Sequence, residues 1–507
     1  MFAILSLLPA LFCAVSAIDP VLSTCHSIAK ALSPASSVYY PGSPHYINDT
    51  SHWSSAINQN STCSVEPGTA DDVSRIVNIS TPRAQIHTVL TSARQLRIIG
   101  TSRIPFAVKG AGHSPNPGFS ATKGVQISMV RFSAIAYDNA SQTVELGAGL
   151  TWEQVYESLE PYGVNVVGGR VATVGVAGLL LGLSYKSNQH GLAMDTVQAF
   201  ELVLPNGTVT SVTTDDGDLW FGLRVCKIRA LTCIISDIRI LDSQGGFNNF
   251  GIVTKFTMKA FPQTDIWGGY LIVPASEMDA LFDAVAKWNI EASDPKAAIN
   301  TAFIYAEGEV MLYQLLFYDA PTPPDDLFDD FTSIPGANNT ATTQSYLSLI
   351  NSGSSISLNS PRALFQAASV RHFTKANLNI IAAQTKYWGD KLTPQSATSL
   401  FNVAETFLPN MFSHSGPSAY PPSRSPTLLP INLYVAWTDP GADKIMHDAL
   451  ATSGKNMTET GEALYTNYAL GDVPLKAIYG DNVERLRAIK RRYDPKNVMG
   501  LAGGYKF

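Results

Sequence analysis

Charge, long apolar runs and metal-ligand spacings are all scarce in this sequence. The chain has 35 Lys and Arg against 41 Asp and Glu, a net charge of −6, with only 15% charged residues. It lacks the positive field that nucleic-acid binding needs, so we expect no nucleic-acid partner. No stretch reaches the roughly 18 consecutive apolar residues that span a bilayer, and we expect no membrane partner. Cys-x-x-Cys and His-x-x-x-His are absent, and we expect no metal site, neither zinc nor iron.

What the chain does have is apolar content, 45% of 507 residues, which is enough for the cores of two or three domains. Residues 1–17 contain an apolar stretch, Phe2 to Leu11, followed by small residues that end at Ala17. We interpret this segment as a cleaved signal peptide, with a buried N-terminal helix as the alternative. Passage through a secretory pathway is also favoured by seven Asn-x-Ser/Thr sites, so we expect a secreted glycoprotein. These sites begin at Asn48, Asn60, Asn78, Asn139, Asn206, Asn338 and Asn456.

Four cysteines remain once the signal peptide, with Cys13, is removed. In an oxidising compartment we expect Cys25 and Cys63 to form a disulfide. Closing that loop constrains the unfolded chain by about 3–4 kcal/mol on the loop-entropy estimate. Cys226 and Cys233 lie in a stretch that is doubtful for reasons given below.

Two kinds of pattern divide the mature chain. From Val65 to about Phe261, short apolar strands alternate with glycine-rich turns and helices, as in an α/β or α+β domain. The predicted strands are at 106–108, 125–128 and 143–146, and a capping box at Thr151 and Gln154 predicts a helix to Leu159. Beyond Pro262 the pattern predicts longer strands (267–273, 310–318) and a helix (276–288), which indicates a second domain.

The most informative motif is a predicted strand that runs into Gly-x-Gly-His, residues 106–113. Glycines at these positions let successive backbone N–H groups converge into a nest for a phosphate or pyrophosphate. Taken alone, the motif is also typical of a tight turn, and His113 of a hydrogen-bonded structural histidine. A Rossmann dinucleotide site is disfavoured, because Gly-x-Gly-x-x-Gly is not completed.

Two further glycine-rich patches follow, at 168–178 and 245–253, and Tyr493-Asp494-Pro495 stands near the C-terminus. In this order and spacing the motifs resemble the berberine-bridge-enzyme-like FAD oxidases of the vanillyl-alcohol oxidase superfamily, of the secreted fungal type. The resemblance implies an α+β fold: an FAD-binding domain of the p-cresol methylhydroxylase type in two subdomains (65–262), a substrate domain with an antiparallel sheet and helices (263–470), and a C-terminal segment (471–507) that packs back on the first domain.

The resemblance also implies FAD bound covalently through the ring of His113. The residues expected to cradle the pyrophosphate are Lys109, Gly110, Ala111, Gly112, His113 and Ser114. The residues expected to line the rest of the cofactor are Val174, Gly175, Gly178, Ile252 and Val253. Some relatives carry a second, cysteinyl link, but Val171 occupies that position here, so we expect a single covalent bond.

The implied reaction is oxidation of an alcohol or activated C–H of a small-molecule substrate, by hydride transfer to flavin and reoxidation by O₂ to hydrogen peroxide. It needs a base within hydrogen-bond reach of the substrate hydroxyl. Tyr468, in Tyr465-Thr466-Asn467-Tyr468, resembles the family's Asn-Tyr element and is the first candidate, with Tyr185 the second. Either could instead be a core or surface tyrosine. A dehydrogenase with another electron acceptor is the alternative reaction.

Three stretches depart from the family pattern. Residues 77–95 and 225–244 interrupt segments that are continuous in the family, and each begins with Val and ends with Gln. Because valine codons begin with GT and one glutamine codon is CAG, each insert fits a short intron read through as protein. The earlier one also fits a real helix, with Thr81 as cap and Pro82 next. The glycine run at Leu181 to Tyr185 is shorter than usual. An inactive secreted glycoprotein without flavin is therefore a further alternative.

Overall fold

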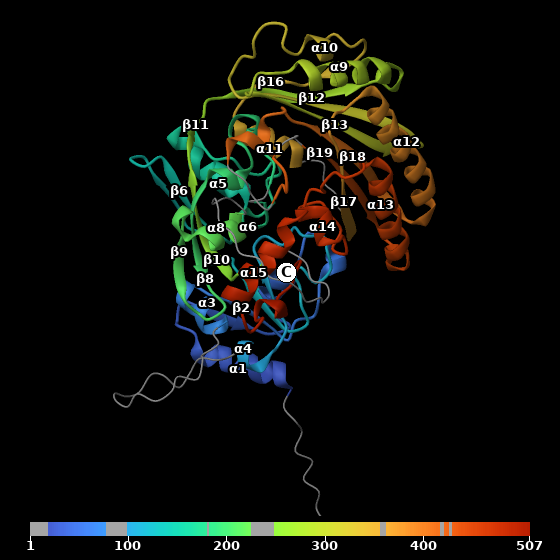
Figure 1. Cartoon of the computed structure of the whole chain (residues 1–507). Helices are drawn as coiled ribbons and strands as arrows, with labels where there is room; N and C mark the ends of the chain where they lie inside the picture. The colour runs from blue at the N-terminus through green and yellow to red at the C-terminus, as the bar shows by residue number, and fades with distance from the viewer. Residues whose placement is uncertain are drawn as a thin grey trace, which may run out of the picture.

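The computed structural model describes residues 19–77, 99–179, 182–224, 248–354, 361–415, 420–424 and 428–507. Strands in these ranges form four sheets, with helices packed around them (Figure 1). The predicted α+β class is confirmed. All of the predicted signal peptide lies outside the described residues. The same holds for both insert segments apart from Val77, for the cysteines Cys226 and Cys233, and for Leu181.

The first sheet carries the strand that leads into the Gly-x-Gly-His motif. Its order is β1-β2-β4-β3, with β2, β4 and β3 parallel and β1 antiparallel at the edge. Every residue of β2 and β4 is buried, as expected for strands covered on both faces. The expected disulfide joins Cys25 of α1 (Pro20–Ala31) to Cys63 at the start of β2. The four strands are β1 (Ser37–Tyr39), β2 (Cys63–Glu66), β3 (Phe106–Lys109) and β4 (Val125–Ser128).

The second sheet is antiparallel, in the order β5-β6-β10-β8-β9. After β6 the chain enters α5 (Trp152–Leu159), and the predicted capping box is present: the Thr151 N–H donates to Gln154 Oε1 at 2.9 Å. A short pair, β7 (Val164–Asn165) with β11 (Phe261–Pro262), forms the third sheet. The five strands of the second sheet are β5 (Ile135–Asp138), β6 (Thr143–Gly147), β8 (Val197–Val203), β9 (Val209–Val212) and β10 (Ile252–Lys259).

The fourth sheet has eight strands, all paired antiparallel, as predicted for the second half of the chain. Helices α9 (Met278–Glu291), α12 (Lys375–Leu392) and α13 (Asp443–Met457) lie along its outer side, and the first half of the chain lies opposite (Figure 1). The predicted strands at 267–273 and 310–318 are present, and the predicted helix at 276–288 begins at Met278. The strands are β12 (Ile266–Val273), β13 (Ala297–Ala306), β14 (Glu309–Tyr318), β15 (Asn338–Asn339), β16 (Thr342–Gln344), β17 (Arg362–Val370), β18 (Ala397–Thr406) and β19 (Leu429–Trp437).

The end of the chain returns to the first half, so the C label lies beside α15 (Asn482–Tyr493) in Figure 1. Arg485 of α15 pairs with Asp218 at 2.8 Å, and the Asn249 side chain donates to the carbonyl of Tyr505 at 3.0 Å. The remaining helices are α2 (Pro44–Thr50), α3 (Ala70–Val77), α4 (Ile99–Ser102), α6 (Val176–Leu179), α7 (Ser187–His190), α8 (Gly217–Arg224), α10 (Asp329–Thr332), α11 (Tyr346–Ser354) and α14 (Leu475–Tyr479). The predicted domain boundaries stay predictions.

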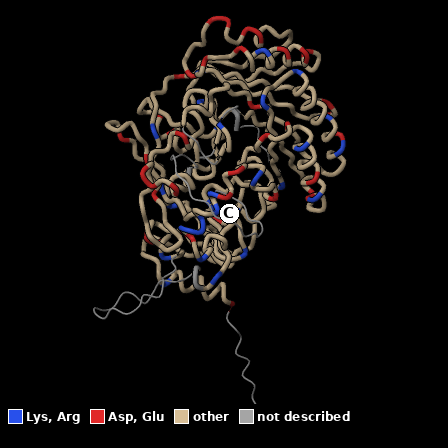
Figure 2. Tube along the Cα trace, viewed as in Figure 1, with Lys and Arg blue, Asp and Glu red and all other residues tan. Residues whose placement is uncertain are grey.

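Basic and acidic residues are interspersed over the outer segments of the chain (Figure 2). Within the described residues, no helix combines the length and the apolar character needed to cross a bilayer.

Candidate functional site

A cavity of about 1030 Å³ lies between the Gly-x-Gly-His loop and the inner face of the eight-stranded sheet. Its volume is at the upper end of the range for cofactor and ligand sites. One wall comes from the glycine-rich patches and the other from side chains of β12, β13, β14, β17, β18 and β19.

The glycine-rich wall is built by two patches in direct contact. A Cβ added at Gly175 would lie 2.9 Å from the Cβ of Ala111, closer than real Cβ atoms come, so only glycine lets the two loops meet. Gly112 adopts φ +78°, in the left-handed region that favours glycine. The structure brings most of the predicted cofactor residues to this cavity: Gly110, Ala111, Gly112, His113, Ser114, Val174, Gly175, Gly178, Ile252 and Val253.

Lys109 is the exception among the predicted cofactor residues. It does not belong to the cavity lining, and its ammonium group donates to the carbonyl of Asn48 at 2.7 Å. Burial lowers the pKa of Lys109, although Asp49 nearby raises it. Successive side chains of β3 point to opposite faces of the sheet, and the neighbouring Val108 is the one that borders the cavity. The Lys109 side chain therefore points the other way and connects β3 to α2.

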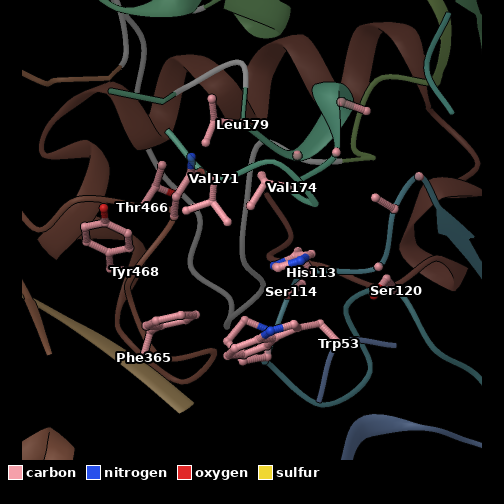
Figure 3. Close-up of a pocket in the computed structure, with 18 of the residues that line it drawn as sticks. Trp53, His113, Ser114, Ser120, Val171, Val174, Leu179, Phe365, Thr466 and Tyr468 are labelled. Carbon is pink, nitrogen blue, oxygen red and sulfur yellow. The ribbon is translucent and has the colours of Figure 1, made fainter. Parts of the chain in front are cut away.

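His113 lies at the cavity edge and is held on two sides. Its Nε2 lies 2.9 Å from Thr173 Oγ1, and its ring stacks on Trp53 at 5.3 Å with an interplanar angle of 20° (Figure 3). Burial lowers the pKa of His113 to about 4, so the imidazole is neutral at physiological pH. A neutral ring keeps one nitrogen lone pair free for bonding.

Trp53 extends this contact into an aromatic ladder. Its backbone N–H donates to the carbonyl of Gly112 at 3.1 Å, which anchors it to the motif loop. The other end of the ladder is Phe365 of β17, whose ring stacks on Trp53 at 5.5 Å and 8° (Figure 3). The loop that carries His113 is thus joined through Trp53 to the opposite wall of the cavity.

A cluster of charged and polar side chains connects the two walls of the cavity. Arg170 Nη2 lies 2.9 Å from Glu405 Oε1 and 3.0 Å from the Tyr468 hydroxyl, which itself donates to Glu405 Oε1 at 2.6 Å. With the Asn300 amide turned so that its oxygen faces the guanidinium, it accepts from Arg170 Nη1 at 2.8 Å. All four side chains line the cavity. Arg170 comes from the second glycine-rich patch, Glu405 from β18 and Asn300 from β13.

The two glycines before Arg170 have a packing reason. A Cβ at Gly168 would lie 2.3 Å from the indole of Trp152, and one at Gly169 would lie 2.4 Å from it. Trp152 is fully buried at the start of α5, so the loop can pass over its ring only without side chains. This close passage sets where Arg170 enters the cavity.

Burial shapes the acid–base character of the two predicted tyrosines. It raises the pKa of Tyr468 well above its usual value, and the charge of Glu405 raises it further, while Arg170 opposes this. Tyr468 is therefore a protonated hydrogen-bond donor to Glu405 in the resting site. Burial also raises the pKa of Tyr185, whose ring stacks on Phe317 at 5.2 Å and lies 5.8 Å from the Arg170 guanidinium carbon. Both tyrosines border the cavity.

Several buried polar atoms on the cavity wall have no hydrogen-bond partner among the described residues: Glu405 Oε2, Asn432 Oδ1, Asn467 Oδ1 and Ser120 Oγ. Leaving buried polar atoms unpaired is costly, so such atoms are rare in native proteins. Unpaired buried atoms also lie away from the cavity, for example Asp49 Oδ1 and Gln126 Oε1, so they do not mark the cavity by themselves.

Comparison with known proteins adds the decisive observation. Residues 61–213 match the family model for an FAD binding domain, and residues 464–502 match the model described as berberine and berberine like. The two matches cover the His113 loop, the Arg170 patch and the segment of Tyr468. The chain is a berberine-bridge-enzyme-like, FAD-linked oxidoreductase.

This oxidoreductase resembles its relatives over nearly its whole length. It is 29% identical to the FAD-dependent monooxygenase drtC of Aspergillus calidoustus, over 96% of this chain and 91% of that protein. Among solved structures, the wild-type berberine-bridge-enzyme-like protein 1 of Physcomitrella patens gives a TM-score of 0.71 at 20% identity, covering 94% and 97% of the two chains. A xylooligosaccharide oxidase of Myceliophthora thermophila gives 0.71 at 16% identity, covering 96% and 99%. These structures share the fold.

The lining of this cavity fits FAD. The glycine wall leaves backbone open to a large planar cofactor, and His113 offers a neutral ring nitrogen. Val171, at the position of the second link in some relatives, also lines the cavity and has no group that could bond to flavin.

Sequence reasoning missed Arg170, Glu405 and Trp53. A signal existed for Glu405, because a glutamate in the apolar strand 397–406 is unusual unless it is paired or functional. Arg170 stood in a glycine patch that was itself recognised, but nothing local assigns it a partner. Trp53 lies outside every recognisable motif and reaches the site only through tertiary contacts.

Proposed function

We propose that this oxidoreductase is a flavin-dependent oxidase that removes a hydride from a hydroxyl-bearing or activated carbon of a small organic substrate. The observation that carries the proposal is the hydrogen-bonded cluster of Arg170, Glu405 and Tyr468 on the wall of the cavity that His113 also borders. It combines a proton acceptor, a proton donor and a fixed positive charge at one buried place, as hydroxyl oxidation requires.

FAD is proposed to be held by the glycine-rich wall and linked covalently to His113. When bound, FAD supplies a two-electron acceptor for the hydride and passes the electrons to O₂, with release of hydrogen peroxide. The contact of Nε2 with Thr173 leaves Nδ1 as the ring nitrogen available for the link. For Nδ1 to be a nucleophile, Nε2 must carry the proton and donate it to Thr173 Oγ1.

Tyr468 cannot act as a base alone, because its raised pKa keeps its proton on the phenol. It can accept the substrate hydroxyl proton while its own proton moves to Glu405 Oε1, only 2.6 Å away. The second oxygen, Glu405 Oε2, is buried and has no hydrogen-bond partner among the described residues. In this relay the proton ends on Glu405.

Arg170 holds Glu405 and Tyr468 in position for this proton transfer. Its guanidinium contacts Glu405 and Tyr468 through the same nitrogen, and these neighbours together with Tyr185 raise its pKa, although burial alone would lower it. A permanently charged Arg170 holds the carboxylate and the phenol in one place and stabilises an oxyanion that forms as the substrate loses its proton. Tyr185, across the guanidinium, is proposed to help orient the substrate.

The test is turnover by the purified, yellow holoenzyme. Candidate alcohols are mixed with it anaerobically, flavin bleaching is followed, and peroxide is measured after air is admitted. Bleaching followed by one peroxide per substrate oxidised supports an oxidase. Tyr468→Phe should lower the bleaching rate by about 10²-fold or more at unchanged flavin content. Unchanged bleaching in Tyr468→Phe would remove Tyr468 from the mechanism.

The same experiment separates the alternatives. Bleaching without reoxidation by air identifies a dehydrogenase with another acceptor. Oxygen consumption that requires a nicotinamide reductant identifies a monooxygenase, the activity in the name of the relative from Aspergillus calidoustus. Colourless purified protein would identify the inactive form. Peptide mass analysis then tests the link, since a flavin-bearing His113 peptide is expected.

Secretion is proposed as well. The disulfide between Cys25 and Cys63 supports an oxidising compartment, and Asn139 and Asn206, two of the expected glycosylation sites, lie in exposed turns. Recovery of the glycosylated protein from culture medium, with an N-terminus after residue 17, is the expected result. Unglycosylated protein retained inside the cell would contradict it.

A further inference from the structure

The inner face of the eight-stranded sheet carries three rows of directly opposed side chains. The polar row runs across Tyr270, Leu315, Asn300 and Glu405. The middle row runs across Tyr313, Ala302, Val403 and Asn432. The aromatic row runs across Ile304, Phe401, Tyr434 and Phe365. All of these residues except Tyr434 line the cavity.

The rows are two residues apart along each strand, and alternate residues share a face. Each step is therefore about 7 Å, and the polar row lies about 13 Å from the aromatic row. Along β18 the cavity residues run from polar to apolar, in the order Glu405, Val403 and Phe401. Along β13 they run likewise through Asn300, Ala302 and Ile304, whereas β14 places Leu315 in the first row and Tyr313 in the middle row.

The rings of the aromatic row are in continuous contact with one another and with Trp53. Phe401 stacks on Tyr434 at 4.4 Å and 19°, Tyr434 contacts Phe365 at 5.2 Å, and Phe365 stacks on Trp53. Phe365 and Phe401 are only half-buried, so each leaves part of its ring facing the cavity. Beside them Ile304, Ala302 and Val403 offer aliphatic surface without hydrogen-bonding groups.

We propose that the substrate is an aromatic alcohol with a flat, fused-ring body. Its hydroxyl group meets Glu405, Tyr468 and Arg170 in the polar row, and its ring body lies along the middle row toward Phe401 and Phe365. This inference rests on the proposed function, because the hydroxyl is placed at the proposed proton acceptor. The spacing of the rows matches a body of two or three fused rings rather than a single ring.

The distribution of polar groups argues against a saccharide. A sugar carries hydroxyl groups around its whole ring, and those placed against Ala302, Val403 and Ile304 would lose water without gaining a partner. An aromatic body loses nothing there and gains ring contacts with Phe401 and Phe365.

The charge of the site favours a neutral ligand. Arg170 is compensated by Glu405 at 2.9 Å, and the other members of the three rows are uncharged side chains. A carboxylate or phosphate on the substrate would have to compete with Glu405 for the guanidinium.

Dead-end ligands test the proposal without turnover. Naphthalen-2-ol has a hydroxyl and a fused-ring body but no carbinol hydrogen to lose, and methyl β-xylobioside represents the sugars. Calorimetric titration of the holoenzyme should give a dissociation constant at least tenfold lower for naphthalen-2-ol. Equal or tighter binding of the xylobioside, or no detectable binding of naphthalen-2-ol, would overturn the proposal.

Two variants locate the ring body on the aromatic row. Phe401→Leu and Ile304→Asn should each weaken naphthalen-2-ol by about fivefold to tenfold. Tyr387→Leu is the matched control, since Tyr387 is an exposed aromatic residue on α12, on the outer side of the sheet. Circular dichroism and flavin absorbance check that each variant is folded, and Phe365→Leu replaces any that is not. Unchanged binding in the folded variants would exclude the aromatic row as the ring site.

The failure of this inference can be told from failure of the proposed function. If the holoenzyme bleaches with sugars and releases peroxide while naphthalen-2-ol binds weakly, the oxidase stands and the aromatic substrate is wrong. If naphthalen-2-ol binds as expected but no alcohol bleaches the flavin, the binding site stands and the reaction is wrong.

Discussion

The two walls of the cavity are built on opposite principles. The cofactor wall is backbone brought close by glycine: a Cβ at Gly175 would lie 2.9 Å from Ala111, and one at Gly251 would lie 2.3 Å from the carbonyl of Val203. The substrate wall is side chains from separate strands, with Glu405, Val403 and Phe401 on β18 facing partners on β13 and β19. A backbone wall binds one cofactor in many enzymes, whereas a side-chain wall changes its ligand with single substitutions.

The largest effect is expected on the substrate wall, at Glu405. Glu405→Gln removes the final proton acceptor but keeps the shape, and kcat/KM should fall by about 10²–10⁴-fold. Flavin content should not change, because Glu405 belongs to the sheet and not to the glycine wall. Stopped-flow reduction and the flavin-to-protein absorbance ratio measure the two quantities. The control is Glu309→Gln, an exposed glutamate at the start of β14. A parallel loss of flavin in Glu405→Gln would contradict the division into a cofactor wall and a substrate wall.

A methyl group on the glycine wall should disturb both walls. In Gly169→Ala the new Cβ meets the Trp152 indole at 2.4 Å, and the loop that carries Arg170 must move. We expect the unfolding free energy to fall by about 1–3 kcal/mol and turnover to fall by about tenfold or more. Denaturant unfolding and kcat are the measurements. Gly441→Ala, at an exposed position with no backbone clash, is the control and should change neither.

A substitution at Thr173 tests whether the cofactor wall selects the tautomer of His113. Thr173→Val keeps the volume but removes the Oγ1 that lies 2.9 Å from Nε2, so the reactive tautomer is no longer selected. Covalent incorporation of FAD into apoprotein should slow by about tenfold, followed as flavin that survives acid precipitation. Thr143→Val, a half-buried strand threonine away from the cavity, is the control. Equal rates in both variants would assign Thr173 a packing role only.

The pH dependence of incorporation has a definite sign. Burial lowers the pKa of His113 from 6.5 to about 4, so the folded imidazole stays neutral as pH falls, until it approaches that value. An exposed histidine would be about 90% protonated at pH 5.5. Wild-type incorporation should therefore change less than about twofold between pH 7.5 and 5.5. A tenfold decrease over that range would mean that His113 titrates like an exposed histidine.

The smallest effect is expected at Lys109. Its ammonium group donates to Asn48 and not into the cavity, so Lys109→Gln should cost about 1 kcal/mol of stability and leave flavin content and kcat within about twofold. Thermal unfolding and flavin absorbance distinguish this result from a pyrophosphate contact, whose loss would lower FAD occupancy. Low FAD occupancy in Lys109→Gln would show that Lys109 contacts the cofactor.

The cofactor wall was open to sequence reasoning because its requirements are local. The glycines at 110, 112 and 175 indicate close approach of the backbone, and the capping box at Thr151 predicts the start of α5. Lys109 shows the limit of that reasoning, because motif membership does not say to which side of a strand a side chain points. The family resemblance supplied Tyr468, but its role depends on Glu405 and Arg170, which no motif connects to it.

Chain-local chemistry was sufficient for the glycine loops and for the strand and helix starts, since each depends on neighbouring residues that share a few dihedral angles. The cofactor class came from the family resemblance. The folded arrangement alone decided that Trp53 bridges His113 and Phe365, that Arg170 meets Glu405, and that polarity falls from Glu405 to Phe401. Those relations are set by strand register and domain packing, which bring together residues far apart in the chain and leave no trace in any one segment.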